Sequence, residues 1–528
     1  MTSITFYGGI SKIGGNCVVI EEKGKRIMLD NGMNFSNENS FYKDFLKPRT
    51  NNDLRDYLEL GLVPKVPGIY GKDKLCDVCI PEMDPRSEYI FHTDLMSYED
   101  YVEKHGSPYI SALFISHCHL DHLRNIKFIS PKIPIYCSKI TKKMIEIICD
   151  LSNYDFLRYD ISEIGERGNR GYFPGTIFKQ KCYEDRMINI IEPRDIIEIP
   201  ENSRNFLVKG YPVDHSVPGA MGFEVFTSEG KCIIYTGDIR FHGHKFEKQH
   251  SFNFLDNIRS NPEVLITEGT RIDDKTEMSE DNVYENMIQQ LKTDGELSEK
   301  LIIASFPWKS ITRFHTLYKI AKKLERTLVI QSKLAYTIHN LQNFDSLGLK
   351  DILKNKNLKI YLPRKSSMIY SNDDYTFGKH YLSYTTNWSR DEEIEFYSTL
   401  YGEDILTKAY EINAEPNWYI LQLSFYDLNE LIDIQPPEGS YYFNLKTEPF
   451  DEEGELEEKV LLNWISKFGL QYEQERYHAS GHASGPEIKE MIKKINPQQI
   501  FPIHTEKPEL FDFKNAITKI QKGREYQI

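Results

Sequence analysis

Short apolar runs bounded by polar residues or glycine recur through the first half of the chain. Residues 26–29, 112–115 and 233–235 are three examples, and each has the length of one buried strand. Residues 1–35 have a strand–turn–strand pattern, and residues 111–270 alternate between strands and helices. The pattern predicts a mixed α/β domain in which polar side chains follow directly after buried strands.

A second series of alternating elements occupies the middle of the chain. Residues 301–304 predict a buried strand, residues 310–324 an amphipathic helix, and residues 327–330 the next strand. Such alternation is typical of a parallel sheet covered by helices. We therefore expect the middle of the chain, about residues 275–465, to form a separate α/β unit.

Near the C-terminus, residues 484–495 carry the signals of a helix with a defined start. Ser484 and Glu487 fit a capping box, Pro486 lies in the first turn, and apolar residues follow at helical spacing. The preceding Ser480-Gly481-His482 would lie against the helix N-terminus, where free N–H groups favour an anion. A phosphate-contacting turn is one interpretation, and a well-capped helix without a ligand is the other.

Residues 36–110 form a long excursion rich in proline, aspartate and tyrosine, which we expect to wrap the entrance of a site. Long connections inside compact domains are usually functional or partly disordered. Cys76 and Cys79 make up the only C-x-x-C and have no second pair at zinc-finger spacing. Ordinary loop cysteines are the preferred interpretation, and a small structural zinc site is the alternative.

The composition is that of a globular enzyme, with 40% hydrophobic and 27% charged residues. The first residues begin a strand at once, so no signal peptide is expected. No apolar run approaches the roughly 20 residues that span a bilayer. The scattered cysteines are expected to be reduced thiols, and the predicted location is cytoplasmic.

The densest group of candidate metal ligands lies in residues 116–122, which read Ser-His-Cys-His-Leu-Asp-His. Alternate residues of an extended segment point to one side, so His117 and His119 can bind one ion. When the chain then turns into a helix, Asp121 and His122 face a second ion. The chain has only 15 histidines in 528 residues. Three of them beside an aspartate therefore indicate a dinuclear metal site rather than a chance polar loop.

This motif resembles the signature of the metallo-β-lactamase fold, and later residues supply the other landmarks in order. Asp30 follows one apolar strand, His215 lies in Asp-His-Ser-Val-Pro-Gly, and Asp238 ends another strand. The resemblance implies one zinc ion on three histidines, a second on Asp121 and His122, and a bridging Asp238. The implied metal ligands are His117, His119, Asp121, His122, His215, Asp238 and His504.

Three further segments resemble motifs A, B and C of the β-CASP nuclease subgroup, which includes ribonuclease J. They are Glu268 in Leu-Ile-Thr-Glu-Gly-Thr, His482 in Ser-Gly-His-Ala-Ser, and His504 in Pro-Ile-His-Thr-Glu. The implied fold class is α/β, an αββα metallo-β-lactamase fold with an inserted α/β β-CASP domain. The expected division is residues 1–274 and 466–528 for the metallo-β-lactamase domain and residues 275–465 for the insert.

The resemblance implies a zinc-dependent ribonuclease with two zinc ions per chain, manganese being possible, and a bridging hydroxide as nucleophile. Asp30 would orient a ligand or the hydroxide, as carboxylates commonly do for metal-bound histidine. His482 would contact the scissile phosphate or assist the leaving group, with Glu268 as its partner. The implied catalytic residues are Asp121, His482, Glu268 and Asp30.

The net charge of −14 bears on the expected substrate. Phosphate neutralisation supplies much of the affinity of nucleic-acid binders, so an acidic chain is not expected to bind long duplexes tightly. Two bound metal ions would add about +4 locally, and basic residues gather in the helix predicted at 310–324. The implied substrate-binding residues are Ser480, His482, Ser484, Lys309 and Arg313.

The RNA-cutting members of the subgroup have histidine at the motif C position, whereas the DNA-repair members typically have valine. His504 therefore favours single-stranded RNA as the substrate. A metal-dependent DNA nuclease or another phosphoester hydrolase on the same fold is the alternative. A non-catalytic scaffold is disfavoured because every ligand position is filled. Endonuclease and 5′-exonuclease modes both remain open, since residues 305–310 depart from the 5′-phosphate pocket of ribonuclease J. The chain ends soon after His504, so the dimerisation domain of ribonuclease J is not expected, and a homo-oligomer is left open.

Overall fold

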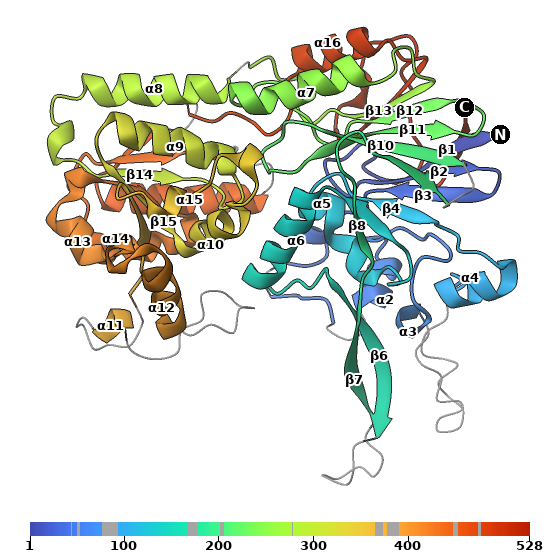
Figure 1. Ribbon diagram of the computed structural model, residues 1–528, viewed down its shortest axis with the longest axis horizontal. Coiled ribbons are helices and arrows are strands. Elements are labelled where there is room, and N and C mark those ends of the chain that lie inside the picture. The colour runs from blue at the N-terminus through green and yellow to red at the C-terminus, as the bar shows by residue number, and fades with distance from the viewer. Residues whose placement is uncertain are drawn as a thin grey trace.

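Two bodies of secondary structure lie side by side in the computed structural model (Figure 1). One body contains two β-sheets and both ends of the chain, and the other is built on a third sheet from the middle of the chain. Cys76 and Cys79 lie outside the described residues. The structure describes all residues except 44, 50–52, 76–92, 167–176, 201–204, 277, 365–372, 377–389, 447–451 and 474–476.

The first sheet has the strand order β22-β1-β2-β3-β4-β5-β8. β1, β2 and β3 are antiparallel neighbours, whereas β3, β4, β5 and β8 are parallel. Ser3 of β1 lies opposite Gln527 of β22, so the two ends of the chain meet at one edge of the sheet. The strands are β1 (Thr2–Gly8), β2 (Cys17–Glu22), β3 (Lys25–Leu29), β4 (Ala112–Phe114), β5 (Ile135–Cys137), β8 (Ile188–Ile190) and β22 (Glu525–Gln527).

The second sheet has the order β21-β13-β12-β11-β10-β9. β9 to β12 form an antiparallel meander, and β12, β13 and β21 are parallel. The strands are β9 (Ile196–Ile199), β10 (Phe206–Pro212), β11 (Met221–Thr227), β12 (Cys232–Tyr235), β13 (Val264–Glu268) and β21 (Gln499–Ile503).

A single hydrophobic core joins the facing sides of these two sheets. Aromatic side chains cross the interface: the ring centroids of Phe6 and Phe501 are 5.0 Å apart, and those of Phe114 and Phe223 are 5.7 Å apart. Alternate strand residues point to opposite faces, so the other face of each sheet also needs a cover. Burial of apolar surface on both faces stabilises the sandwich.

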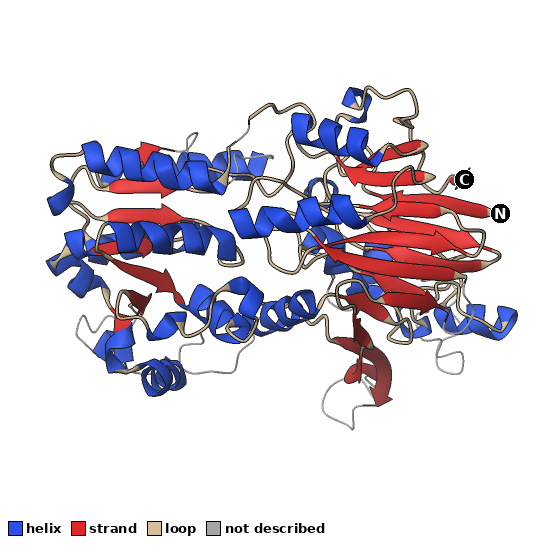
Figure 2. Ribbon diagram, turned by 45° about the horizontal axis from the view of Figure 1, so that its top comes forward, coloured by secondary structure: helices blue, strands red, loops and turns tan. Residues whose placement is uncertain are grey.

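Helices supply that cover. The apolar face of α6 packs on the first sheet, and the apolar faces of α7 and α16 pack on the second, which completes an αββα arrangement (Figure 2). Ser484 caps α16 in the predicted capping box with Glu487. The helices of this body are α1 (Phe35–Asn39), α2 (Asp53–Glu59), α3 (Lys72–Leu75), α4 (Tyr98–His105), α5 (Leu120–Leu123), α6 (Lys139–Leu151), α7 (Lys245–Asn257) and α16 (Gly485–Ile495).

The excursion at residues 36–110 differs from the expected long loop. Its described residues form the short helices α1 to α4, and Leu54, Tyr57 and Leu58 of α2 are buried in the core beneath the first sheet. The sequence pattern missed these helices because each is shorter than the window over which helical periodicity can be recognised. Separately, β6 (Arg158–Glu166) and β7 (Ile177–Asp185) form a hairpin that extends away from the sandwich (Figure 1).

The middle of the chain forms a parallel sheet, as its alternating pattern predicts. The order is β17-β16-β15-β18-β14-β19-β20, and every neighbouring pair is parallel. The predicted strand at 301–304 and helix at 310–324 are β14 and α9. The strands are β14 (Ile302–Ser305), β15 (Thr327–Gln331), β16 (Leu358–Tyr361), β17 (Leu406–Thr407), β18 (Tyr419–Gln422), β19 (Tyr441–Asn444) and β20 (Gln471–Glu473).

Helices cover both faces of this sheet, as fully buried parallel sheets require. One face packs against α8, α9 and α10, and the other packs against α13, α14 and α15. The helices are α8 (Glu280–Thr293), α9 (Ile311–Lys323), α10 (Ser332–Leu341), α11 (Asp373–Thr376), α12 (Arg390–Tyr401), α13 (Ala409–Ala414), α14 (Leu431–Ile434) and α15 (Glu452–Lys467).

The two bodies touch through α6 and α10, where the Tyr336 hydroxyl donates to Asp150 at 2.8 Å. The division into residues 1–274 and 466–528 for one domain and 275–465 for the other remains a proposal. β20 lies beyond residue 465 and still pairs with β19 in the sheet of the insert. No helix within the described residues has both the length and the apolar character needed to cross a membrane.

Candidate metal centre

The candidate ligands lie where strands of both sheets end. Asp30 follows β3, residues 116–122 follow β4, Asp238 follows β12, and His504 follows β21. β3 and β4 are parallel neighbours, and so are β12, β13 and β21. Because the carboxyl ends of parallel strands meet at one edge, each sheet delivers several polar side chains to the same end of the sandwich.

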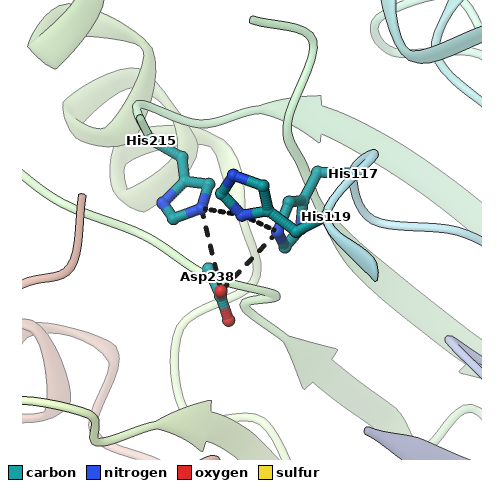
Figure 3. Close-up of side chains that lie close together, drawn as sticks. All are labelled: His117, His119, His215 and Asp238. Atoms are coloured by element: carbon teal, nitrogen blue, oxygen red, sulfur yellow. Dashed lines mark hydrogen bonds and ion pairs between the residues drawn. The ribbon is translucent and has the colours of Figure 1, made fainter. Parts of the chain in front are cut away.

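Three imidazoles and one carboxylate form a first group (Figure 3). His119 Nδ1 lies 3.0 Å from His117 Nε2 and 3.1 Å from His215 Nε2. Asp238 Oδ2 lies 3.6 Å from His117 Nε2 and 3.7 Å from His215 Nε2. Four donor atoms of the types that bind zinc thus converge on one point.

A second group shares Asp238 with the first. It consists of Asp121, His122, Asp238 and His504. Asp238 Oδ2 lies 3.2 Å from His122 Nε2 and 3.8 Å from His504 Nε2, and Asp121 Oδ2 lies 3.0 Å from His504 Nε2. The structure thereby brings together all seven residues expected to bind metal, with one carboxylate common to both groups.

The burial of these atoms fits a cation. Both carboxylate oxygens of Asp238 and Nε2 of His122 are buried and have no hydrogen-bond partner among the described residues. A buried polar atom without a partner is costly, and a bound metal ion removes that cost. Burial, reinforced by neighbouring imidazoles, holds the pKa of His117 and of His215 well below the usual range. Both imidazoles are therefore neutral, as metal binding requires.

Asp30 contacts the second ligand group through His122, on the side of the ring that faces away from Asp238. Its carboxylate accepts hydrogen bonds from the Ser116 backbone N–H at 2.7 Å and the Tyr235 hydroxyl at 2.5 Å. His122 Nδ1 lies 2.7 Å from Asp30 Oδ2, so Nδ1 carries the proton and Nε2 faces Asp238. Such a carboxylate–histidine pair fixes the tautomer and the ring orientation of a metal-binding imidazole.

Glu268 and Thr270 connect the segments expected to be motifs A, B and C. Glu268 Oε2 lies 2.8 Å from His482 Nδ1 and accepts from the Thr270 hydroxyl at 2.8 Å. The same hydroxyl lies 2.8 Å from His504 Nδ1, while the Ile239 N–H donates to Glu268 Oε1. One carboxylate therefore holds the rings of both His482 and His504, the latter through Thr270.

His482 lies beside the two groups of candidate ligands. Its Nδ1 is 3.8 Å from Asp238 Oδ2, and it forms a third cluster with Asp238, Glu268 and His504. Although burial lowers it, the carboxylates of Glu268, Asp238 and Asp121 raise the pKa of His482 to about 9. A protonated imidazole at this place can donate a proton or attract an anion. The assignment of His482 to the phosphate rather than to a metal stays a prediction.

Two residues of the site have a positive φ, which non-glycine residues rarely adopt. The φ angles of Asp30 and His504 are 54° and 51°. Backbone strain of this kind is maintained only where the surroundings determine it strongly, and it gathers at functional sites. The His504 N–H donates to the Gly9 carbonyl at 2.7 Å, which fixes the turn that presents the ring.

The four other residues expected to bind substrate occupy different environments. Lys309 precedes α9 and is half-buried, and its charge contributes with burial to lowering the pKa of His119 to about 4. Ser480 is buried, and its hydroxyl accepts from the His482 N–H at 3.2 Å. Ser484 is fully buried and its hydroxyl belongs to the cap of α16, which places it inside the protein rather than on a surface open to substrate.

Arg313 also differs from the expectation. Its side chain is only 4% exposed, and its guanidinium binds Glu280 and three backbone carbonyls. Residue type and helical spacing suggested a basic surface, whereas Arg313 lies on the buried side of α9. Arg313 is therefore corrected from a substrate contact to an internal ion pair.

Several residues that hold the site were missed from the sequence. For Tyr235 at the end of β12 and Thr270 after β13, the sequence offered one signal of a role in the site. Each carries a polar group at or just beyond the end of an apolar strand. Ser116 gave a similar signal. Its hydroxyl donates to Asp30 and lies 3.0 Å from His117 Nδ1. Their roles depend on long-range contacts that a single sequence does not reveal.

Comparison with known proteins places these observations in a family context. Residues 470–526 match the Zn-dependent metallo-hydrolase RNA specificity domain. Ribonuclease J of Mycoplasma genitalium is 22% identical over 97% of this chain and 69% of its own length. Ribonuclease J of Pyrococcus abyssi is 21% identical over 96% of this chain and 90% of its own length.

Among solved structures, a protein of unknown function from Enterococcus faecalis V583 matches 99% of both chains, with a TM-score of 0.66 and 21% identity. This likeness shows that the arrangement of both bodies occurs in another protein. The chain thus has the metallo-β-lactamase fold, its residues 470–526 match a Zn-dependent metallo-hydrolase RNA specificity domain, and it is distantly similar to ribonuclease J along nearly its whole length.

Proposed function

We propose that this protein is a zinc-dependent ribonuclease that hydrolyses RNA phosphodiester bonds with two metal ions per chain. The observation that carries the proposal is the buried carboxylate of Asp238, which is common to two groups of ligand atoms. A carboxylate shared by two ligand groups can bridge a pair of ions about 3.5–4 Å apart, the separation typical of two-metal hydrolases.

The chain's own residues fit two ions. His117, His119, His215 and Asp238 would hold one, and Asp121, His122, Asp238 and His504 would hold the other. Bound zinc would activate water for attack and stabilise negative charge on the phosphate. Manganese is the alternative metal, because the carboxylate donors Asp121 and Asp238 also suit it.

The remaining groups of the site position and move protons. Asp30 keeps the His122 proton on Nδ1, and the Thr270 hydroxyl can accept a hydrogen bond from His504 Nδ1 while it donates one to Glu268. His482, held by Glu268, is the group that would contact the scissile phosphate or protonate the leaving oxygen. Catalysis by a positioned acid typically contributes roughly 10²–10⁴-fold to the rate.

Two observations support RNA as the substrate. The matched domain is described as an RNA specificity domain, and it contains both His482 and His504. The relatives that match along the whole chain are named ribonuclease J. Single-stranded RNA is therefore the proposed substrate, and a DNA nuclease of the same mechanism is the competing proposal.

The test combines metal analysis with cleavage of four substrates: 5′-phosphorylated RNA, 5′-triphosphorylated RNA, single-stranded DNA and duplex DNA. We expect close to two ions per chain and selective cleavage of RNA. Asp238→Ala should abolish cleavage and release both ions, because they share this carboxylate.

Asp256→Ala is the matched control, since the Asp256 side chain is 57% exposed and pairs with Lys494 at the surface. It should keep metal and activity. Full metal content in Asp238→Ala would contradict the shared-carboxylate geometry. Equal cleavage of DNA and RNA would favour the competing nuclease.

A further inference from the structure

The segment of residues 477–483 carries His482 and runs from the insert back to the sandwich. Its backbone carbonyls are held by side chains from several elements. His215 Nδ1 lies 2.6 Å from the Gly481 carbonyl, and Arg271 donates to the His482 carbonyl at 3.1 Å. The Ser480 carbonyl accepts from Arg240 at 3.2 Å and lies 3.0 Å from His242 Nε2. Nothing in the proposed chemistry accounts for this number of cationic and imidazole donors on one short segment.

Arg313 holds the first part of this segment from the insert. Its guanidinium donates to the Tyr477 carbonyl at 3.0 Å and to the Ala479 carbonyl at 3.2 Å. It also donates to the Leu445 carbonyl at 3.1 Å, just beyond β19. The planar guanidinium carries five donors in a fixed arrangement, so a single side chain can span several acceptors.

Glu280 fixes Arg313 in turn. The two side chains form a bidentate ion pair with distances of 3.1 and 3.0 Å, and both are buried. Thr316 donates to Glu280 at 3.0 Å, and Arg240 of the sandwich lies 3.7 Å from the same carboxylate. Although burial raises it, Arg313 and Arg240 lower the pKa of Glu280 to about 2, so the carboxylate stays ionised.

Arg240 completes the connection to the metal centre. It lies two residues after Asp238, and its Nε donates to Asp214 at 2.8 Å. Asp214 directly precedes His215, a candidate metal ligand. The cluster of Arg313, Glu280 and Arg240 therefore joins α8 and α9 of the insert to the segment of His482 and to the turn of His215.

We propose that Arg313 is a positioning residue, which holds His482 in its catalytic place by clamping the carbonyls of residues 477 and 479. The inference rests on the proposed function, because it assigns Arg313 an effect on the rate through His482. It explains why an arginine is buried here. Lysine would keep the charge toward Glu280 but has a single ammonium, which cannot span the same acceptors.

The test compares Arg313→Lys with Arg326→Lys. Arg326 is also buried in the insert and also donates to backbone carbonyls, those of Leu297, Lys300 and Tyr419, but it does not touch residues 477–483. We expect Arg313→Lys to lower kcat by about 100-fold, the effect of misplacing a reacting group by about 1 Å. KM and metal content should change little, and Arg326→Lys should keep kcat.

Two further measurements separate positioning from simple loss of stability. In a His482→Ala background, Arg313→Lys should cause no additional loss of kcat, because coupled residues are not additive. Hydrogen–deuterium exchange of peptides covering residues 477–483 should rise in Arg313→Lys and not in Arg326→Lys. If Arg313→Lys fails to fold, Glu280→Gln, which weakens the anchor of Arg313, should give the same changes at smaller size.

Equal kcat and equal exchange in Arg313→Lys and Arg326→Lys would overturn the inference, as would loss of metal in Arg313→Lys alone. The exchange measurement does not depend on activity. If the wild-type protein cleaves no RNA but residues 477–483 still exchange faster in Arg313→Lys, the proposed function is rejected and the clamp is kept.

Discussion

At the scale of single residues, three imidazoles of the site are oriented by the ring nitrogen that faces away from the candidate metal positions. His122, His215 and His504 direct Nδ1 to Asp30, to the Gly481 carbonyl and to Thr270, respectively. Each partner can accept a hydrogen bond from Nδ1–H, so Nε2 is left for the interior of the site. These second partners determine the ligand geometry as much as the ligands themselves do.

The sequence predicted that the candidate ligands of residues 117–122 lie close together, because these residues are neighbours along the covalent chain. His117, His119, Asp121 and His122 lie within one turn and its flanks, so their convergence is a local property. The error at Arg313 has the opposite origin. A basic residue on an amphipathic helix is usually exposed, and only the long-range ion pair with Glu280 explains its burial.

The two C-terminal histidines give a prediction at this scale. His504 Nε2 lies 3.0 Å from Asp121 Oδ2 and belongs to the second ligand group, whereas His482 Nδ1 lies 2.8 Å from Glu268 Oε2. His504→Ala should therefore lower occupancy of the second metal. His482→Ala should keep both metals and lose roughly 10²–10⁴-fold in rate.

The measurements are metal content and kcat for both variants. His250→Ala is the matched control, because His250 lies on α7 outside the three clusters of candidate ligands in the described part of the chain. Zinc loss in His482→Ala, or an unchanged rate, would show that the two roles have been assigned the wrong way round.

At the scale of elements, the sequence predicted the strands better than their connections. β4, β14, β15 and α9 lie within one residue of the apolar runs that predicted them. Buried strands and amphipathic helices are recognisable because their periodicity is continuous. The helices α1 to α4 escaped notice because they are short and depend on packing against the core rather than on their own pattern.

The start of α7 makes a pH-dependent contribution to stability. Glu247 accepts from the His244 N–H at 3.2 Å and from the Thr312 hydroxyl at 2.7 Å, which joins α7 to α9. Burial, together with Asp214 and despite Arg240, raises the pKa of Glu247 from 4.5 to about 7. Between these two values the folded state binds more protons than the unfolded state. The free energy of unfolding therefore falls as pH rises from 4.5 to about 7.

Glu247→Gln imitates the protonated side chain and should remove this cost. At pH 8 we expect the variant to unfold at a higher temperature than the wild type, by the equivalent of about 1–3 kcal/mol. At pH 4.5 the difference should vanish. Thermal unfolding of both proteins across pH 4.5–8 measures it, with exposed Glu285→Gln on α8 as the control. A pH-independent difference would mean that Glu247 is ionised throughout.

At the scale of the whole molecule, the architecture answers the objection raised by the net charge of −14. The sandwich supplies the candidate metal ligands, and the insert adds a cation beside them. Lys309 belongs to the turn between β14 and α9, yet its charge acts on His119 and Cys118 of the sandwich. Only the tertiary fold brings these segments together, so a single sequence could suggest the residue but not its neighbours.

Lys309 therefore gives the prediction that tests whether the two bodies share one substrate. Burial lowers the pKa of Lys309, and the ammonium forms no hydrogen bond or ion pair with any residue in the described ranges. An ammonium without a carboxylate partner beside a metal centre is suited to a phosphate oxygen. Lys309→Gln should raise KM for RNA by roughly tenfold, about 1.4 kcal/mol, and reduce the salt dependence of binding by about one phosphate contact.

Metal content and melting temperature should stay close to those of the wild type, because Lys309 supports no internal ion pair among the described residues. Lys319→Gln is the matched control, since Lys319 lies exposed on the adjoining helix α9. If the loss of positive charge acts only in a general way, KM should change equally in Lys309→Gln and Lys319→Gln. That outcome would mean that the RNA does not pass beside Lys309. A larger change in Lys309→Gln alone would mean that the insert and the sandwich bind the same phosphate backbone, one through an ammonium and the other through its metal ions.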